Sequence, residues 1–180
     1  MKSKILLIII FFLVKNNVFA ENLSIQAKDI TLDKNKKTSV FKNDVSIITE
    51  EKNSIKSDYA EFDRKKNIIK LRGNIIAKDN LNNTVSSEYA EYDNNTKIFK
   101  SQGPTKIITS ENYKINGKNI IFNSKENIIR SNENTIITDI ENNLIYLDSF
   151  EYLSNKNIFK SIGLIKIKDK INNEYEFSQI

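Results

Sequence analysis

Ser57-Asp58-Tyr59-Ala60-Glu61-Phe62-Asp63 returns thirty positions later as Ser87-Glu88-Tyr89-Ala90-Glu91-Tyr92-Asp93. The same phase continues outside both copies at Leu32-Asp33, Phe122-Asn123 and Tyr152-Leu153. Self-similarity at a fixed period indicates a repeated structural unit, because each unit buries its apolar face against its neighbours. Five and a fraction units of thirty residues fill the chain after residue 20 without an insertion.

Apolar and polar residues alternate within each unit, which is typical of a half-buried β-strand. Ile69, Leu71, Ile75 and Ala77 form one alternating set. In the other half of each unit the parity of the apolar positions changes once, as between residues 57 and 60. A parity change turns the faces of a strand over unless a bulge or bend absorbs the extra residue. We therefore expect sharp bends near residues 58, 88, 118 and 148.

Turn-forming polar clusters separate the apolar sets at residues 64–67, 79–83, 94–97, 123–127 and 154–157. Gly73, Gly103 and Gly163 share one phase with Asn43, which predicts a positive φ or a second bend there. The pattern predicts an all-β fold, an antiparallel, bent-strand jellyroll or taco of thirty-residue repeats with an apolar interior groove. A right-handed parallel β-helix is the alternative. In the first fold, residues near 62 and 71 face one another, whereas in the second, residue 62 lies above residue 92.

Composition excludes several kinds of chemistry. The chain has no His and no Cys, so it has no Ser-His-Asp or Cys-His nucleophile, no thiolate or imidazole zinc site and no disulfide. The carboxylate pairs Asp58/Glu61 and Glu88/Glu91 recur with the structural period, whereas a catalytic pair is expected once. Asp63 and Asp93 fit turn formation better than calcium binding, because no Asp-rich cluster surrounds them. We expect no enzyme activity, no cofactor and no metal site.

The N-terminus differs from the rest of the chain. Lys2 and Lys4 precede an apolar run from Ile5 to Val14, and Val18-Phe19-Ala20 follows a polar break. This order predicts a secretory signal peptide over residues 1–20. The run is too short for a comfortable membrane span, and a buried first strand or an uncleaved anchor are the alternatives. Removing residues 1–20 takes away three lysines and no acid, so the formal charge falls from +5 to +2, which argues against nucleic-acid binding.

A family resemblance rests on the leader, on Ala60-Glu61-Phe62-Asp63 and its copy at residues 90–93, and on Leu71-Arg72-Gly73-Asn74-Ile75. Together they resemble the OstA-like N-terminal domain of periplasmic lipopolysaccharide-transport proteins and of the outer-membrane lipopolysaccharide-assembly protein. The resemblance covers about residues 24–180 and implies two β-walls whose apolar interior carries the acyl chains of lipid A. Pro104 departs from the family pattern after Gly103, and the later repeats keep only the apolar phase.

Physical chemistry favours the same groove. Each CH₂ group left in water costs on the order of 0.8 kcal/mol, so a lipid with several acyl chains needs an apolar escort. The alternative for every inward residue is packing within a filled core, and recurring small residues suit either case. The candidate groove residues are Ile30, Leu32, Ala60, Phe62, Leu71, Ile75, Ala90, Tyr92, Phe99, Ile120, Phe122, Phe150 and Tyr152.

We therefore expect a non-catalytic periplasmic conduit that binds lipopolysaccharide acyl chains during transport to, and assembly in, the outer membrane. An exported β-solenoid acting as a structural module or adhesin is the alternative. Expected partners are lipopolysaccharide, other β-groove proteins that pair with its edge strands, and a C-terminal outer-membrane β-barrel outside this chain. We expect residues 21–180 to form one domain that stops within its sixth repeat. We also expect unpaired edges near residues 24–32 and 171–180, the first of which receives the upstream carrier.

Overall fold

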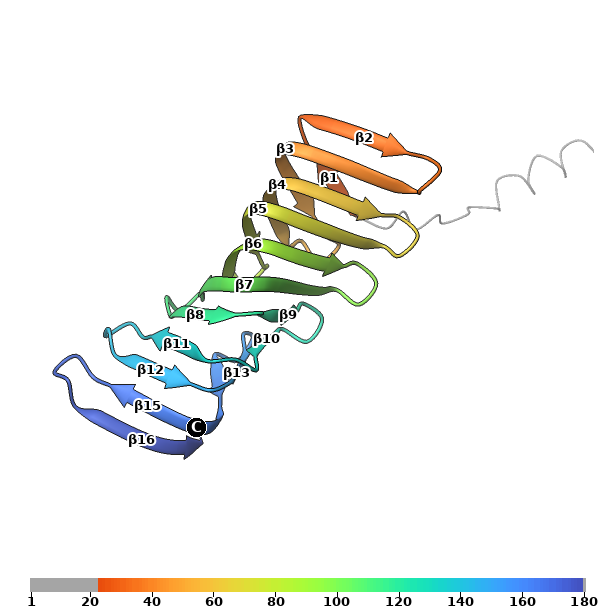
Figure 1. The fold of residues 1–180 in the computed structure, drawn as a ribbon. Coiled ribbons are helices and arrows are strands. Elements are labelled where there is room, and N and C mark those ends of the chain that lie inside the picture. The colour runs from red at the N-terminus through yellow and green to blue at the C-terminus, as the bar shows by residue number, and fades with distance from the viewer. Residues whose placement is uncertain (1–22, 180) are drawn as a thin grey trace, which may run out of the picture.

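The computed structural model describes residues 23–179, which form one antiparallel sheet of sixteen strands (Figure 1). The strands are β1 (Ser24–Gln26), β2 (Asp29–Asp33), β3 (Thr38–Ile48), β4 (Ser54–Asp63), β5 (Ile68–Lys78), β6 (Thr84–Asp93), β7 (Ile98–Ile108), β8 (Lys114–Lys118), β9 (Ile121–Asn123), β10 (Ile128–Ser131), β11 (Thr135–Thr138), β12 (Leu144–Leu147), β13 (Phe150–Leu153), β14 (Ile158–Lys160), β15 (Ile162–Lys168) and β16 (Glu174–Gln179). The expected signal peptide lies outside the described residues. Within them, no helix is long and apolar enough to cross a membrane.

The all-β, antiparallel fold is confirmed by the pairing of the strands. Ala60 lies opposite Leu71 and Phe62 opposite Ile69 on neighbouring antiparallel strands, β4 and β5. Phe62 therefore does not stack over Tyr92 as a coil of a parallel β-helix requires, because Ile69 on β5 lies between them. The β-helix alternative is wrong. The alternative function, a β-solenoid that acts as a structural module or adhesin, depended on that fold.

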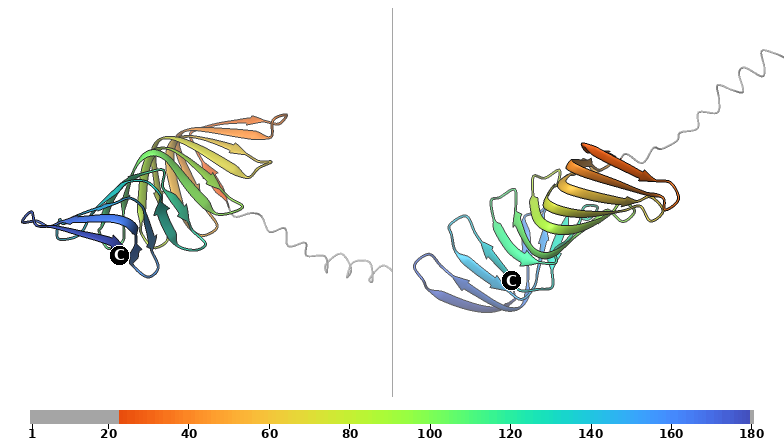
Figure 2. Two further views of the ribbon diagram at one scale, coloured as in Figure 1. Left: turned by 60° about the horizontal axis from the view of Figure 1, so that its bottom comes forward. Right: turned by 45° about the horizontal axis from the view of Figure 1, so that its top comes forward.

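The long strands bend in the middle and so contribute to two walls, which converge along the line of bends like the sides of a V (Figure 2). Wall A consists of β2, β9, β10, β13 and β14 and of residues 38–42, 59–63, 68–72, 89–93 and 98–102. Wall B consists of β1, β8, β11, β12, β15 and β16 and of residues 45–48, 54–57, 75–78, 84–87 and 104–108. After β7 the two walls continue as separate sets of shorter strands.

Irregularities in the ladder mark each bend. The register slips between Lys56 and Tyr59 and again between Ser87 and Tyr89. Farther along the chain, the strands are interrupted at residues 119–120 and 148–149. The bends predicted near residues 58, 88, 118 and 148 are confirmed. Each one absorbs the parity change, so that apolar residues on both sides of the bend point to the same interior.

Positive φ angles at the bends allow the backbone to turn. Gly73 and Gly103 have φ angles of 74° and 77°, and Asn43 has a φ of 63°, as the shared phase predicts. Asp58 lies beside Gly73 and accepts a hydrogen bond from Asn74 Nδ2 at 2.8 Å. Where β4 and β5 bend side by side, a left-handed glycine on β5 therefore lies next to a carboxylate on β4 that accepts a hydrogen bond from Asn74, the residue after the glycine.

Turns at the wall A rim are built from side-chain to backbone hydrogen bonds. Asp63 Oδ1 accepts the N–H groups of Lys65 and Lys66 at 2.9 and 3.0 Å, and Asp93 Oδ1 accepts the two equivalent N–H groups in the next wall A turn. Burial raises the pKa of the Asp93 carboxyl, but the hydrogen bonds from Asn95 and Thr96 outweigh burial and hold this pKa below its ordinary value. The interpretation of both aspartates as turn formers is confirmed.

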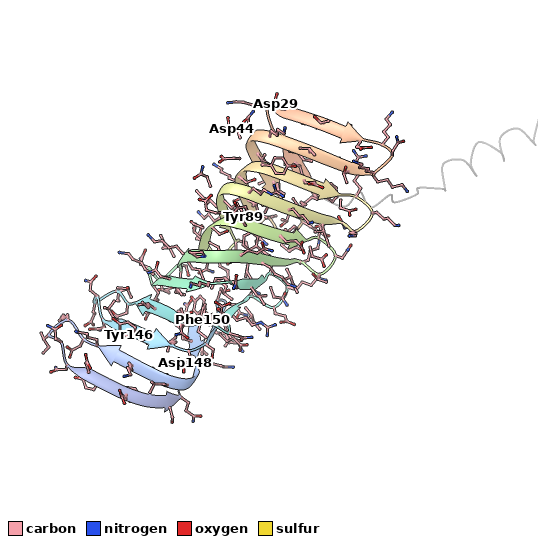
Figure 3. All side chains as sticks on the ribbon, in the orientation of Figure 1. Asp29, Asp44, Tyr89, Tyr146, Asp148 and Phe150 are labelled. Carbon is pink, nitrogen blue, oxygen red and sulfur yellow. The ribbon has the colours of Figure 1, made fainter. Side chains whose placement is uncertain are left out.

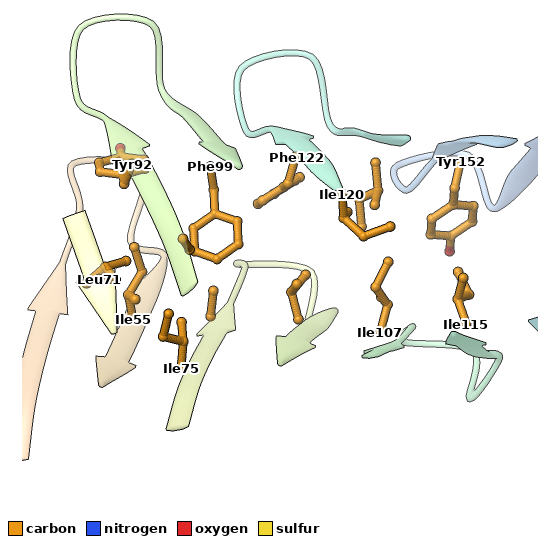
Figure 4. Close-up of a cluster of buried hydrophobic side chains, with 14 of the residues drawn as sticks. Ile55, Leu71, Ile75, Tyr92, Phe99, Ile107, Ile115, Ile120, Phe122 and Tyr152 are labelled. Carbon is orange, nitrogen blue, oxygen red and sulfur yellow. The ribbon is translucent and has the colours of Figure 1, made fainter. Parts of the chain in front are cut away.

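The core lies between the walls. Ile107 and Ile115 of wall B face Ile120, which lies in the bend just before β9, and Tyr152 of wall A, and all four side chains are fully buried (Figure 4). Burial of a large apolar side chain contributes about 1.5–3 kcal/mol, so this wall-to-wall packing is the main stabilising contact of the V.

We predict that Gly73→Ala lowers the free energy of unfolding by about 2 kcal/mol, because a side chain at positive φ is strained and the new Cβ meets Asp58. An ideal Cβ at Gly73 lies 2.5 Å from Asp58 Oδ2. Denaturant unfolding, followed by circular dichroism, measures the change.

Gly103→Ala is the matched control, because Gly103 has nearly the same φ but no heavy atom within 4 Å of the added Cβ. We expect a loss of about 1 kcal/mol from strain alone. Equal losses at both positions would show that the contact with Asp58 contributes nothing.

Candidate functional site

The inner faces of the two walls form one continuous apolar surface. Direct pairing across successive strands of wall A aligns a largely aromatic row, namely Phe62, Ile69, Tyr92, Phe99, Phe122, Ile129, Tyr152 and Phe159. The facing row of wall B is aliphatic except for its last residue and comprises Ile47, Ile55, Ala77, Val85, Ile107, Ile115, Ile137, Ile145, Ile167 and Tyr175. These two rows give the interior its apolar character along the whole sheet.

The candidate residues from the sequence all belong to this interior. Ten are buried, namely Ala60, Leu71, Ile75, Ala90, Tyr92, Phe99, Ile120, Phe122, Phe150 and Tyr152. Phe62 is partly buried, and Ile30 and Leu32 are exposed. Ile75 is the single wall B member of the set, so the sequence reasoning missed wall B residues such as Ile107 and Ile115. The same two-residue alternation marks those residues in the sequence.

The middle of the interior is filled by side chains. The cavity beside Tyr92 and Phe99 has a volume of about 10 Å³, which is room for about one water molecule at most. Aromatic stacking adds to the packing, because the rings of Tyr152 and Phe159 are stacked with centroids 4.3 Å apart. Acyl chains can occupy this part of the interior only if the walls move apart.

The interior is uncovered at both ends of the sheet. Ile30 and Leu32 on β2 are 52% and 56% exposed, although they lie opposite the buried residues Phe41 and Ser39. At the other end, Phe177 on β16 is 47% exposed and lies opposite the fully buried Ile165. Large apolar side chains of the inner face therefore meet solvent where the array ends. Exposed apolar surface of this kind marks interaction sites.

Polar contacts join the rims of the two walls on the side opposite the bends. Lys97, in the turn between β6 and β7, places Nζ 3.3 Å from Glu50 Oε2 and 3.6 Å from Glu51 Oε1 in the turn after β3. We call Glu50, Glu51 and Lys97 the rim latch. Burial raises the pKa of the nearby Tyr92 phenol, and the negative charge of Glu51 raises it further. The latch therefore spans the two rims next to Tyr92 of the aromatic row.

A second polar contact closes the rim farther along the sheet. Asn157 Nδ2, in the turn after β13, donates to Glu111 Oε1 at 3.2 Å in the turn before β8. The Tyr152 hydroxyl donates to Asn157 Oδ1 at 2.9 Å, and burial raises the pKa of this phenol. Neither rim contact belongs to the backbone ladder, so both can open while every strand stays paired.

The sheet has free edges at both ends of the array. Among the described strands, β1 and β2 pair only with β3, β16 pairs only with β15, and β14 pairs only with β13. Each of these strands presents unpaired backbone donors and acceptors on one side. The free edges predicted near residues 24–32 and 171–180 are confirmed within the part of the chain that the structure describes.

Comparison with solved structures finds low similarity. The chain is 14% identical to LptH from Pseudomonas aeruginosa, described as the LptA homologous periplasmic component of the conserved lipopolysaccharide transport device, with a TM-score of 0.32 over 79% of this chain and 82% of LptH. The TCP10 domain of Danio rerio CPAP is 8% identical, with a TM-score of 0.17 over 87% of this chain and 99% of that domain. At these TM-scores, neither similarity supports a functional conclusion.

Comparison with sequences gives a family. No curated protein matches the chain. The sequence profile of the LptC-related lipopolysaccharide-assembly proteins matches residues 14–136, which is more than half of the chain and includes the sheet as far as β11. The resemblance to lipopolysaccharide-transport domains is thereby confirmed. The chain belongs to the LptC-related family of lipopolysaccharide-assembly proteins.

Proposed function

We propose that this protein is a non-catalytic periplasmic conduit that holds lipopolysaccharide acyl chains between its two walls during transport to, and assembly in, the outer membrane. One observation carries the proposal: two facing rows of apolar side chains follow the interior from strand to strand, and large apolar residues of the inner face are exposed at both ends, Ile30 at one and Phe177 at the other. Membership of the LptC-related family supports the choice of cargo.

The energetics of this role come from the hydrophobic effect. Each CH₂ group moved from water to an apolar surface contributes roughly 0.8 kcal/mol. The facing aromatic and aliphatic rows provide such a surface and use no cofactor or reaction. When an acyl chain replaces a wall-to-wall contact, apolar atoms exchange one apolar neighbour for another. Loading of the interior therefore costs little hydrophobic free energy and yields the transfer free energy of the lipid.

Loading requires the walls to separate, because the middle of the interior is filled. The rim latch and the Asn157–Glu111 contact are the polar links between the rims, and we assign them the role of a lateral closure. The bends that contain Gly73 and Gly103 lie at the opposite side and serve as the hinge line. Opening there changes the angle between the walls while the strand ladder stays intact.

The free edges supply contacts to neighbouring carriers. We assign the edges of β1 and β2 to an upstream β-groove protein and the edges of β14 and β16 to a downstream one. Strand addition would satisfy the unpaired backbone groups and cover the exposed Ile30, Leu32 and Phe177 together. The apolar inner faces would then continue from one protein to the next, in the periplasm and up to the outer membrane.

We expect benzoylphenylalanine in place of Phe122 or Phe62 to form adducts with lipopolysaccharide on irradiation of living cells, because both residues belong to the inner aromatic row. The same substitution at Tyr89, an aromatic residue on the outer face of wall A that is 55% exposed, is the control and should form none. Immunoblotting for lipopolysaccharide reads out the adducts. Adducts with proteins alone at the inner positions would refute the conduit.

Holding the rims together should block loading. The chain has no cysteine, so Glu50→Cys with Lys97→Cys gives one reactive pair across the rim, which a reducible bis-maleimide can join. We expect the lipopolysaccharide adduct at benzoylphenylalanine in position 122 to fall at least about fivefold in the joined protein and to return on reduction. This reconstituted reaction uses purified protein and lipopolysaccharide.

Asp63→Cys with Lys66→Cys is the matched control, because it likewise joins an acidic residue and the lysine that pairs with it, here within a single wall A turn. This pair should leave the adduct yield unchanged. An equal yield from the joined rim pair would contradict separation of the walls.

Backbone hydrogen exchange should be fast at the outward-facing amides of β2 and β16 in the isolated chain, because their edges are unpaired. Adding a partner β-groove protein should slow exchange at one of these edges and leave the central strand β5 unchanged. Slow exchange at both edges in the isolated monomer would mean that they are already covered, and the end-to-end arrangement would be abandoned.

A further inference from the structure

The outer faces of the two walls carry different charge patterns. On wall A, Glu61 lies opposite Lys70, Lys70 opposite Glu91, and Glu91 opposite Lys100. Farther along, Arg130 lies opposite Glu151, which also pairs with Lys160. Opposite charges on neighbouring strands stabilise a sheet, and they leave this face nearly neutral. The outer face of wall A is an ordinary solvated surface.

Wall B has no such balance. Between β3 and β12 its two central outer rows, as far as the structure describes them, contain lysine, small polar residues, isoleucine, one tyrosine and one leucine, and no carboxylate. The first row is Ser46, Lys56, Ile76, Ser86, Lys106, Asn116, Ile136 and Tyr146. The second row is Ile48, Ser54, Lys78, Thr84, Ile108, Lys114, Thr138 and Leu144.

Three lysines of wall B form a cluster. Lys106 on β7 lies opposite Asn116 on β8, and Lys114 and Lys118 flank Asn116 on the same face. Both are therefore diagonal neighbours of Lys106, at about 7–8 Å between backbones. Among the described residues, none of the three forms an ion pair with a carboxylate. Like charges placed so closely are unfavourable, and a bound anion would relieve their repulsion.

A hollow with a volume of about 910 Å³ lies in the same outer face, within the range of roughly 300–1,000 Å³ that is usual for small-molecule sites. Lys106 and Lys118 line it together with the small residues Ser86, Asn116 and Asn134. On the side toward the C-terminus, Ile136, Tyr146 and Leu164 line it with exposed apolar side chains. Figure 3 shows Tyr146 on β12 in this part of wall B.

The remaining charges of the hollow leave the cluster unneutralised. Glu88 and Asp148 line the side near the bends, each about two strands from Lys118, which is roughly 10 Å. Lys166, at the far end, is already paired with Glu176 at 3.0 Å. Cationic groups therefore concentrate at β7 and β8, and apolar side chains at β11, β12 and β15.

We propose that this hollow binds one molecule of a single-chain anionic phospholipid. The phosphate lies between Lys106 and Lys118, which line the hollow and whose ammonium groups donate to its oxygens, and Asn116 lies beneath it. Lys114, next to Asn116 on the same face of β8, adds positive charge at the margin of the hollow. The hydrocarbon chain lies across Ile136, Tyr146 and Leu164, a path of three strand spacings from β8 or about 15 Å. The recessed floor favours one inserted molecule over contact with a flat bilayer. This site is on the opposite face from the proposed interior groove and does not depend on it.

Calorimetric titration with lauroyl lysophosphatidylglycerol, below its micelle concentration, tests the proposal on the intact chain. We expect Lys106→Gln with Lys118→Gln to weaken binding at least about tenfold, since each lost charged hydrogen bond is a large share of the affinity. The control, Lys70→Gln with Lys100→Gln, removes the same charge from wall A and should change binding less than about twofold. Lauroyl lysophosphatidylcholine, with the same chain and a neutral headgroup, should bind at least about tenfold more weakly.

Changes in the NMR chemical shifts of backbone amides locate the ligand and should fall on β8, β11 and β12. In the same titrations, Leu164→Asn should lower the affinity for both lysophospholipids and leave the preference for the anionic headgroup unchanged. Four results would overturn the proposal: equal losses in the two double variants, equal affinity for both lipids, shifts at Phe122 and Tyr152 of the interior, or binding only to phosphatidylglycerol vesicles. The last would identify a membrane-contact surface. If the hollow instead bound an acidic protein and no lipid, the lipid site would likewise be rejected.

Discussion

The structure depends on bending each strand across two walls without breaking the ladder of backbone hydrogen bonds. A strand that changes parity turns its apolar side chains outward, unless an extra residue is absorbed at the same point. Here the register slip beside Asp58 and the left-handed glycine at Gly73 absorb it, so apolar residues before and after the bend face one interior. Wall-to-wall packing, the rim latch and the two open ends all follow from this geometry.

One apolar interior has two uses in this architecture. In the structure described here, side chains such as Phe99 and Ile107 stabilise the V by packing across it. The same side chains would form the lining for an acyl chain if the walls moved apart. The backbone hydrogen bonds join neighbouring strands along the sheet, whereas the rim contacts join the two walls. The rim contacts can therefore break while the backbone hydrogen bonds stay intact. The polar rim contacts lie on the side opposite the bends, which we propose as the hinge line.

The outer faces show that charge placement is independent of the inner apolar pattern. Every second residue of a strand faces outward, so the sequence can vary there without loss of the core. Wall A uses this freedom to pair Glu61 and Glu91 with lysines. Wall B instead groups Lys106, Lys114 and Lys118 on two neighbouring strands, and two of them, Lys106 and Lys118, line a hollow together with small polar residues and exposed apolar side chains. Stability of the sheet does not require this grouping.

The sequence by itself determined the strands, the bends and the turns, because these depend on local signals: alternation, the parity change at residues 57–60, and Asp63 before a polar turn. It also identified the inward side of each strand, although the candidate groove set omitted wall B residues such as Ile115. Only the tertiary structure decided which inward residues are buried and which are open, since Ile30 and Tyr92 share a pattern but differ in position along the array. The rim latch joins residues 47 positions apart, and the lysine cluster depends on strand register, so neither could be read from local sequence.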